Sequence, residues 1–235
     1  KVLEANAIGT LAILMGDVPF SEIGTDVEDP KFDTQKTVLA SLSSLLDEAI
    51  ADLTTASSRN ESFDIVFSGD KSKWIEAAYT LKARYALVQS DYSAALSAAN
   101  NGISSSAGDM MYNPRGDAAI DQGDKNLFYT LLAGSRTGDI GNTGSYLLKM
   151  LNPAESVYRG NAKTNELARH NYYMVDENSA SGNTGVAHQY EPQPFATYSE
   201  NQLIKAEAAA RTSGFAAGLT NLNTYRAWLA TGGRL

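Results

Sequence analysis

Apolar residues recur every three or four positions in several long segments of the chain, which is the spacing of an amphipathic α-helix. These segments cover residues 1–15, about 34–53, about 72–89, about 92–103, 198–211 and 215 to about 230. The first carries Leu3, Ala7, Leu11 and Leu14 on one stripe, and the third is expected to turn Trp74, Ala77, Ala78, Leu81, Tyr85 and Val88 inward. Asp33 and Thr34 are suitable N-caps for the second helix, and Asp91 is one for the fourth. The pattern predicts an all-α protein.

The first helix is expected to stop at the sequence "MGDVPFSE". Gly16 can adopt the left-handed conformation that closes a helix, and Pro19 cannot continue one. Val18 precedes the proline and is therefore biased toward an extended conformation. We expect this stretch to open a structural connector over residues 17–33.

Two pairs of the helical segments resemble each other. A shift of 123 positions places the sequence Leu81-Lys82-Ala83 on Ile204-Lys205-Ala206 and Tyr92 on Phe215. In both copies a helix of small residues turns into a second helix that opens on an aromatic, as in tetratricopeptide helix pairs. The alternative is two unrelated helical hairpins that share only amphipathic spacing.

The region between these segments has a different composition. Residues 104–197 are rich in Gly, Asn, Ser and Asp and contain only short apolar pieces. We therefore expect one domain over residues 1–235, with a helical scaffold at about 1–103 and 198–235 and a loop-rich, irregular region at about 104–197.

Composition excludes several functions. The net charge is −8, so the chain offers no basic surface for nucleic acid or for docking on anionic lipid. Cysteine is absent, which removes disulfides, zinc–thiolate sites and thiol nucleophiles. No apolar run approaches the roughly 20 residues that span a bilayer.

Motifs for catalysis or cofactor binding are weak. His170 and His188 lack the spacing of a metalloprotease site. Ser68-Gly69-Asp70-Lys71 lacks the companion motifs of penicillin-recognising enzymes and is interpreted as the turn before the third helix. The glycine-rich stretch 138–144 matches no nucleotide-binding pattern and is interpreted as a flexible loop. We expect no catalytic residues, no metal site and no cofactor.

Two sets of carboxylates offer alternatives to this expectation. Glu200 and Glu207 fall on nearly the same helix face, as a glycosidase acid and base could, but an ion pair with a basic neighbour explains Glu207 more simply. Asp117, Asp121 and Asp124 could hold calcium, although their spacing is not that of an EF-hand and solvated carboxylates are the simpler interpretation.

Several longer stretches occur in an order that resembles a known family. They are "GDVPFSE", "DPKFDTQ" before "LDEAIADL", "DIVFSGDKSKWIEAAYTLKARYAL", and "TYSENQLIKAEAAAR" before "LNTYRAWL". Together, from Ala5 to Trp228, they resemble the SusD/RagB family, lipoproteins of the Bacteroidetes outer-membrane surface. Asn152-Pro153-Ala154 only loosely matches the family's Asp-Pro-Arg.

The resemblance implies a scaffold of four tetratricopeptide-like helix pairs with loops as the ligand surface. It implies non-catalytic binding of an oligosaccharide or polysaccharide and delivery to a SusC-type TonB-dependent transporter. The chain begins in helical rhythm and without an initiator Met, so we expect a fragment that lacks the family's N-terminal region, with the lipid anchor outside it.

Tyrosine is the residue most suited to a glycan surface, because its ring is apolar and its hydroxyl tolerates water. Most of the 12 tyrosines fall in the loop-rich region, interleaved with Asn, Asp and Arg, and about half are expected to pack the loops. The candidate ligand-binding residues are Tyr112, Arg115, Tyr158, Arg159, Tyr172 and Tyr173.

A second function remains open at this point. The helix pairs could instead bind a peptide or protein partner in a groove lined by Lys82, Arg84 and Lys205. The long loop region favours the glycan hypothesis, since a simple repeat scaffold does not need it. A peptide ligand on the same loops is also compatible with the family.

Overall fold

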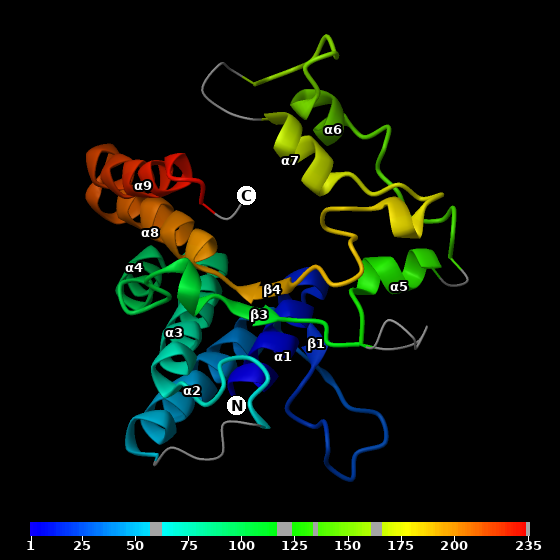
Figure 1. The fold of residues 1–235 in the computed structure, drawn as a ribbon. Helices are drawn as coiled ribbons and strands as arrows, with labels where there is room; N and C mark the ends of the chain where they lie inside the picture. Colours follow the sequence, from blue (N-terminus) through cyan, green and yellow to red (C-terminus); the bar gives the residue numbers. More distant parts are fainter. Residues whose placement is uncertain (57–62, 117–123, 134–135, 161–165, 234–235) are drawn as a thin grey trace. The chain divides into compact units, whose positions relative to one another are not determined.

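The computed structural model describes residues 1–56, 63–116, 124–133, 136–160 and 166–233. The chain divides into two compact units (Figure 1). The helical unit comprises Lys1–Met111 and Pro194–Arg234, and the loop-rich unit comprises Tyr112–Gln193.

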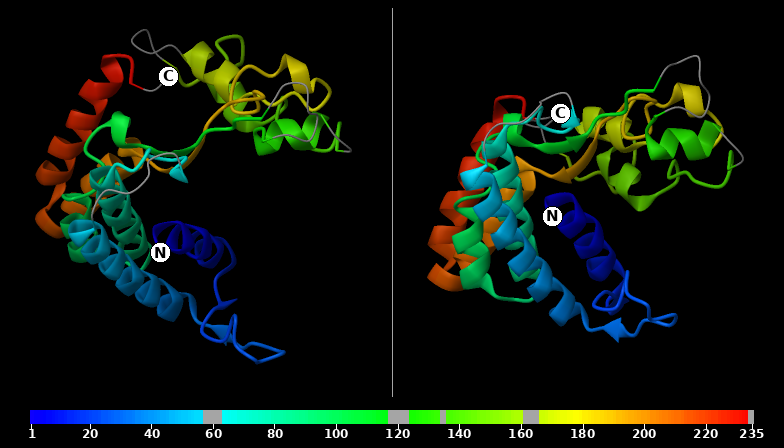
Figure 2. Two further views of the ribbon diagram at one scale, coloured as in Figure 1. Left: turned by 60° about the horizontal axis from the view of Figure 1, so that its bottom comes forward. Right: turned by 90° about the horizontal axis from the view of Figure 1, so that it is seen from below.

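The helical unit is built from helices that pack in succession. They are α1 (Val2–Met15), α2 (Gln35–Thr55), α3 (Lys71–Val88), α4 (Tyr92–Ala99), α8 (Tyr198–Ser213) and α9 (Phe215–Ala230). Each packs against the next in this order, and α4 packs against α8 although about a hundred residues separate them (Figure 2). The helix pairs α3–α4 and α8–α9 are the two copies that the sequence repeat predicted. The all-α fold is confirmed.

Side-chain caps fix where these helices begin. The hydroxyl of Thr34 accepts a hydrogen bond from the Thr37 amide, and the Asp91 carboxylate accepts one from the Ala94 amide, as predicted. The predicted extension of α4 to Ile103 is wrong. The helix ends at Ala99, because the following Asn-Asn-Gly sequence forms a turn that buries Ile103 outside the helix.

The packing face of α1 is not the apolar stripe seen in the sequence. Its buried residues are Val2, Ala5, Asn6, Gly9 and Ala12. Leu3 and Leu11 are exposed, and Leu14 is 73% exposed. Gly9 lies against the ring of Tyr85 on α3, so closely that a Cβ at this position would be 2.3 Å from the tyrosine oxygen. Close approach of two helices selects small residues, so the three leucines of the predicted stripe face outward.

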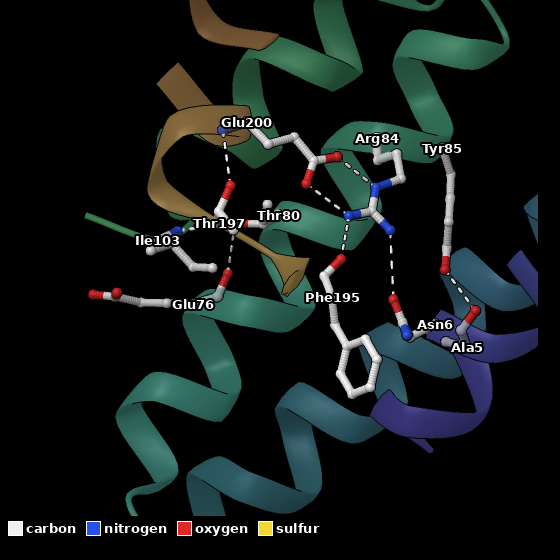
Figure 3. A network of polar contacts seen from close by, with 10 residues as sticks. All are labelled: Ala5, Asn6, Glu76, Thr80, Arg84, Tyr85, Ile103, Phe195, Thr197 and Glu200. Carbon is white, nitrogen blue, oxygen red and sulfur yellow. Dashed lines mark hydrogen bonds and ion pairs between the residues drawn. The ribbon is translucent and has the colours of Figure 1, made fainter. Parts of the chain in front are cut away.

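Helix α3 follows its prediction over most of its length. Ala77, Ala78, Leu81 and Tyr85 are buried and Trp74 is partly buried, but Val88 in the last turn is exposed. The hydroxyl of Tyr85 donates to the Ala5 carbonyl at 2.6 Å and so ties α3 to α1 (Figure 3). Burial raises the pKa of this hydroxyl.

The connector after α1 has the predicted form. Gly16 has φ +86°, and β1 (Val18–Pro19) pairs antiparallel with β2 (Phe32–Asp33). The Gln35 amide donates to Asp17 at 2.9 Å. Val18 is buried in the core of the unit, so the stretch closes the α1–α2 connection, which is the structural role expected from the sequence.

A partly buried carboxylate organises the turn before α3. Asp64 accepts hydrogen bonds from the Trp74 indole at 2.7 Å and from the amides of Val66, Phe67 and Gly69 at 2.9–3.1 Å. Burial opposes the charged form, but these bonds outweigh it and hold the pKa of Asp64 below its ordinary value. The Ser68–Lys71 tetrad forms this turn and the start of α3, as expected.

The replacement Asp64→Asn is expected to lower the free energy of unfolding by about 2 kcal/mol at pH 7, because an amide nitrogen then faces backbone donors. A carboxyl whose folded pKa is depressed stabilises the protein above its unfolded pKa and loses that effect as pH falls through the folded pKa. The difference in the free energy of unfolding between wild type and variant should therefore become smaller below about pH 4. Urea unfolding between pH 3 and 7 measures it, and a difference that is constant with pH would contradict the assignment.

The loop-rich unit contains more regular structure than its composition indicated. Its helices are α5 (Leu127–Ala133), α6 (Tyr146–Leu151) and α7 (Glu166–Tyr173), with a 3₁₀ turn at η3 (Ala180–Gly182). A further turn, η2 (Ser106–Gly108), and the paired strands β3 (Met110–Tyr112) and β4 (Gln193–Ala196) lie where the chain leaves and re-enters the helical unit. Leu132, Val175 and Ala187 form a small core. The prediction of an irregular region was therefore wrong for these three short helices, which are too short to show a clear periodicity.

Candidate ligand-binding site

Tyr112 and Arg115 are brought together by one carboxylate. The hydroxyl of Tyr112 donates to Asp124 Oδ1, and the amide of Arg115 donates to Oδ2 at 3.2 Å. The Arg115 guanidinium lies 3.5 Å from the same oxygen, and the arginine side chain is largely exposed. Asp124 therefore orients the predicted pair. The other two members of the acidic set, Asp117 and Asp121, lie outside the described residues.

Tyr158 and Arg159 follow α6 in a tight turn. The amide of Arg159 donates to the Met150 carbonyl at 2.9 Å, and its side chain is exposed. The Tyr158 ring folds back over Gly160, where a Cβ would lie 2.0 Å from the phenolic oxygen. This tyrosine thus packs its own loop while part of its surface stays accessible.

Tyr172 and Tyr173 end α7 as a contacting pair. Their ring centroids are 5.2 Å apart at an interplanar angle of 80°. The hydroxyl of Tyr172 donates to Glu191 at 2.9 Å, and its carbonyl accepts from the Val186 amide at 2.8 Å. Tyr172 is therefore held in place from both ends, and the partly buried Tyr173 packs edge-on against it.

A polar pocket of about 420 Å³ lies in the same unit and was not anticipated from the sequence. Its lining comes from the glycine-rich stretch 138–145, without Ile140, and from Glu177. Asn142 anchors this loop: its side chain accepts from the Val175 amide at 2.8 Å and donates to the Tyr173 carbonyl at 2.9 Å. The interpretation of the stretch as a flexible loop overlooked this anchoring, which depends on partners about 30 residues further along the chain.

Two of the three basic residues of the alternative peptide groove, Lys82 and Arg84, form contacts within the scaffold. Lys82 forms an ion pair with Asp47. Arg84 forms two hydrogen bonds with the Glu200 carboxylate, at 2.5 and 2.6 Å, and donates to the Phe195 carbonyl (Figure 3). Burial opposes the charge of Arg84, but the contact with Glu200 outweighs it and raises the pKa of the guanidinium.

The candidate acid and base of the helical unit each have a basic partner. Glu200 is held by Arg84, and Glu207 lies 3.5 Å from Arg211 one turn along α8, which confirms the ion-pair interpretation of Glu207. In the part of the chain that the structure describes, no group of three or more His, Asp or Glu side chains is placed to hold a metal ion. Within the same residues, no helix combines the length and apolar character needed to cross a membrane.

The helical unit is a scaffold of packed helix pairs, and the loop-rich unit contains tyrosines and polar side chains. The chain belongs to the SusD-like family, described as "Starch-binding associating with outer membrane", whose model matches residues 1–229. The resemblance noted in the sequence is thereby confirmed. Among curated proteins, no sequence matches the chain significantly.

Solved structures share the fold at low identity. A SusD/RagB family protein from Bacteroides thetaiotaomicron is 21% identical, with a TM-score of 0.60 over 94% of this chain and 50% of its own. A chitin-binding SusD homologue from Flavobacterium johnsoniae is 16% identical, with a TM-score of 0.59 over 95% and 52%. A SusD homologue from Parabacteroides distasonis is 18% identical, with a TM-score of 0.59 over 99% and 56%. The chain thus spans about half the length of these relatives.

Proposed function

We propose that the chain is part of a non-catalytic cell-surface protein that binds an oligosaccharide or polysaccharide and delivers it to a SusC-type TonB-dependent transporter. The observation that carries this proposal is the loop-rich unit, which a scaffold of the SusD-like family holds and which presents tyrosines, an exposed arginine and a polar pocket. A relative of the same fold is described as chitin-binding. The proposed location is the outer-membrane surface, with the lipid anchor outside these residues.

The proposed contacts follow the chemistry of sugars, whose C–H faces stack on aromatic rings and whose hydroxyls need polar partners. Tyr112 with Arg115 provides a ring and a guanidinium oriented by Asp124. Tyr158 with Arg159 provides a second ring and guanidinium. Tyr172 and Tyr173, whose rings are in contact, provide a third aromatic surface. The ligand itself stays open among glycan classes.

Affinity electrophoresis of the full-length protein in gels containing starch, soluble chitin derivatives and plant glycans tests the proposal. Retardation by one glycan class is expected, with Tyr112→Ala or Tyr158→Ala weakening it about three- to tenfold through loss of ring contacts. Tyr112→Phe and Tyr158→Phe are the matched controls, because they keep the ring. Retardation that neither alanine variant changes would reject these residues as the site. No retardation by any glycan would reject the function.

The second candidate function is peptide binding on the scaffold. Its support is an apolar groove of about 360 Å³ between α8 and α9, lined by Leu203, Phe215, Leu219 and Leu222 among others. Peptide binding that Leu203→Asp abolishes, in a protein that no glycan retards, would favour this function over the first.

A further inference from the structure

We infer that the pocket formed by residues 138–145 and Glu177, here called the Glu177 pocket, is a saccharide subsite that accepts uncharged sugar units and rejects acidic ones. The inference deepens the proposed function and rests on it. The glycine-rich stretch, which matches no known motif, thereby gains a role in ligand binding. Selection of the ligand by its charge is a property that the tyrosine surfaces do not imply.

The size and construction of the cavity suit a small ligand. Its volume of about 420 Å³ falls in the range of roughly 300–1,000 Å³ that ligand pockets occupy. The loop is held by Asn142, and the Gly138 amide donates to the Glu177 carbonyl at 2.8 Å. These hydrogen bonds join the glycine-rich loop to the segment that contains Glu177, so the backbone on both sides of the pocket is held.

The glycines allow the carboxylate to reach the loop. Gly138 has φ +90°, a conformation that other residues rarely adopt. At Gly141 a Cβ would lie 2.1 Å from Glu177 Oε2, so any side chain there would displace the carboxylate. The approach of Glu177 to the loop backbone therefore explains the glycine at position 141, and the positive φ explains the one at position 138.

The charge of the pocket is negative. Asp139 is paired with Arg136 at 2.8 Å, so its charge is compensated. Within the described residues, Glu177 forms no ion pair, and its hydrogen-bond partner is the Thr143 hydroxyl at 3.4 Å. A carboxylate with free lone pairs accepts sugar hydroxyls and repels a uronate or sulfate group.

An aromatic residue directly follows the pocket-lining residues in the sequence. Ser145 lines the pocket, and its hydroxyl accepts from the Leu148 amide as the N-cap of α6. Tyr146 follows directly and is 57% exposed. Polar acceptors beside an exposed ring are the combination that a sugar unit with one apolar face and several hydroxyls requires.

The test compares neutral and acidic polysaccharides by affinity electrophoresis of the full-length protein. The neutral probes are starch, glucomannan and glycol chitin, and the acidic probes are polygalacturonate and alginate. Wild type should be retarded by at least one neutral probe and by neither acidic probe. Glu177→Gln should weaken the neutral interaction about tenfold, since a charge-assisted hydrogen bond is lost. Glu177→Lys should abolish it and permit retardation by an acidic probe.

Glu28→Gln is the matched control, because it makes the same charge change at an exposed position of the helical unit and should bind as wild type does. Neutral binding that Glu177→Gln leaves unchanged would overturn the subsite while leaving the proposed function intact, and so would strong retardation of wild type by an acidic probe. Absence of retardation by every probe would overturn both.

Discussion

Replacing Glu200 by methionine is expected to lower the free energy of unfolding by about 3 kcal/mol, whereas the same replacement at Glu207, seven residues along α8, should change it by less than about 0.5 kcal/mol. The two glutamates differ in the burial of their ion pairs. The Arg84 and Glu200 side chains are 18% and 29% exposed, and those of Arg211 and Glu207 are 59% and 48% exposed.

The cost at Glu200 comes from the charge that is left behind. Arg84 keeps its hydrogen bonds to the Phe195 carbonyl and, at 3.4 Å, to Asn6, but loses the carboxylate that compensates its charge (Figure 3). A buried guanidinium without a counter-charge is strongly unfavourable. Because this cluster joins α1, α3, β4 and α8, its loss weakens contacts among all four elements.

Urea unfolding followed by circular dichroism measures both variants. The double variant Arg84→Met/Glu200→Met should recover most of the lost stability, since replacing a whole buried pair by apolar residues is often neutral. A double variant as unstable as Glu200→Met alone would show that packing, not the unpaired charge, caused the loss. Equal losses at Glu200 and Glu207 would likewise contradict the argument.

Local signals predicted the helical unit well because they act over a few residues. The Thr34 and Asp91 caps, the Gly16 stop and the turn before α3 each depend on neighbours close in sequence, and each appears as expected. The family motifs lie in these same segments. Periodicity failed at α1, where the contact of Gly9 with Tyr85 decides the packing face and no pattern within the helix records it.

Contacts between distant residues were beyond reach from a single sequence. Arg84 and Glu200 are 116 positions apart, and the sequence analysis assigned them to separate hypothetical roles, a peptide groove and a catalytic pair. The Glu177 pocket depends on a similar long-range approach, of Glu177 to Gly141. Tyr112 and Arg115, two residues predicted for the loop surface, do share a hydrogen-bond partner, Asp124. From the sequence, however, this carboxylate was considered only as a calcium ligand.

Asn201 on α8 is the polar group whose alteration should be most damaging. It is 1% exposed, and its side-chain nitrogen donates to the carbonyls of Ala99 and Ile103, both at 3.0 Å. These bonds connect α8 to the turn after α4. The oxygen Oδ1 accepts no hydrogen bond from any described residue and faces Gly102, where a Cβ would lie 2.6 Å away. The side-chain nitrogen of Asn201 thus satisfies two carbonyl oxygens, while its oxygen lies against the turn at Gly102.

The replacement Asn201→Asp should therefore lower the free energy of unfolding at pH 7 by about 4 kcal/mol, because it removes both donors and places a carboxylate against two carbonyl oxygens. Burial and these oxygens raise the pKa of the new carboxyl in the folded state. A group with a raised folded pKa costs least below its unfolded pKa, about 3.9, and costs more as pH rises through the folded pKa. The deficit relative to wild type should thus be smallest in acid.

Asn223→Asp supplies the control for this replacement, since Asn223 is exposed on α9 and its side-chain oxygen accepts from Arg226 at 3.3 Å. There the added charge faces a guanidinium, so stability should change by less than about 0.5 kcal/mol. Urea unfolding of both variants and wild type from pH 4 to 8 measures the two differences. A deficit for Asn201→Asp that does not grow with pH would mean that the carboxylate escapes to solvent, and that the α4–α8 contact yields more easily than its burial implies.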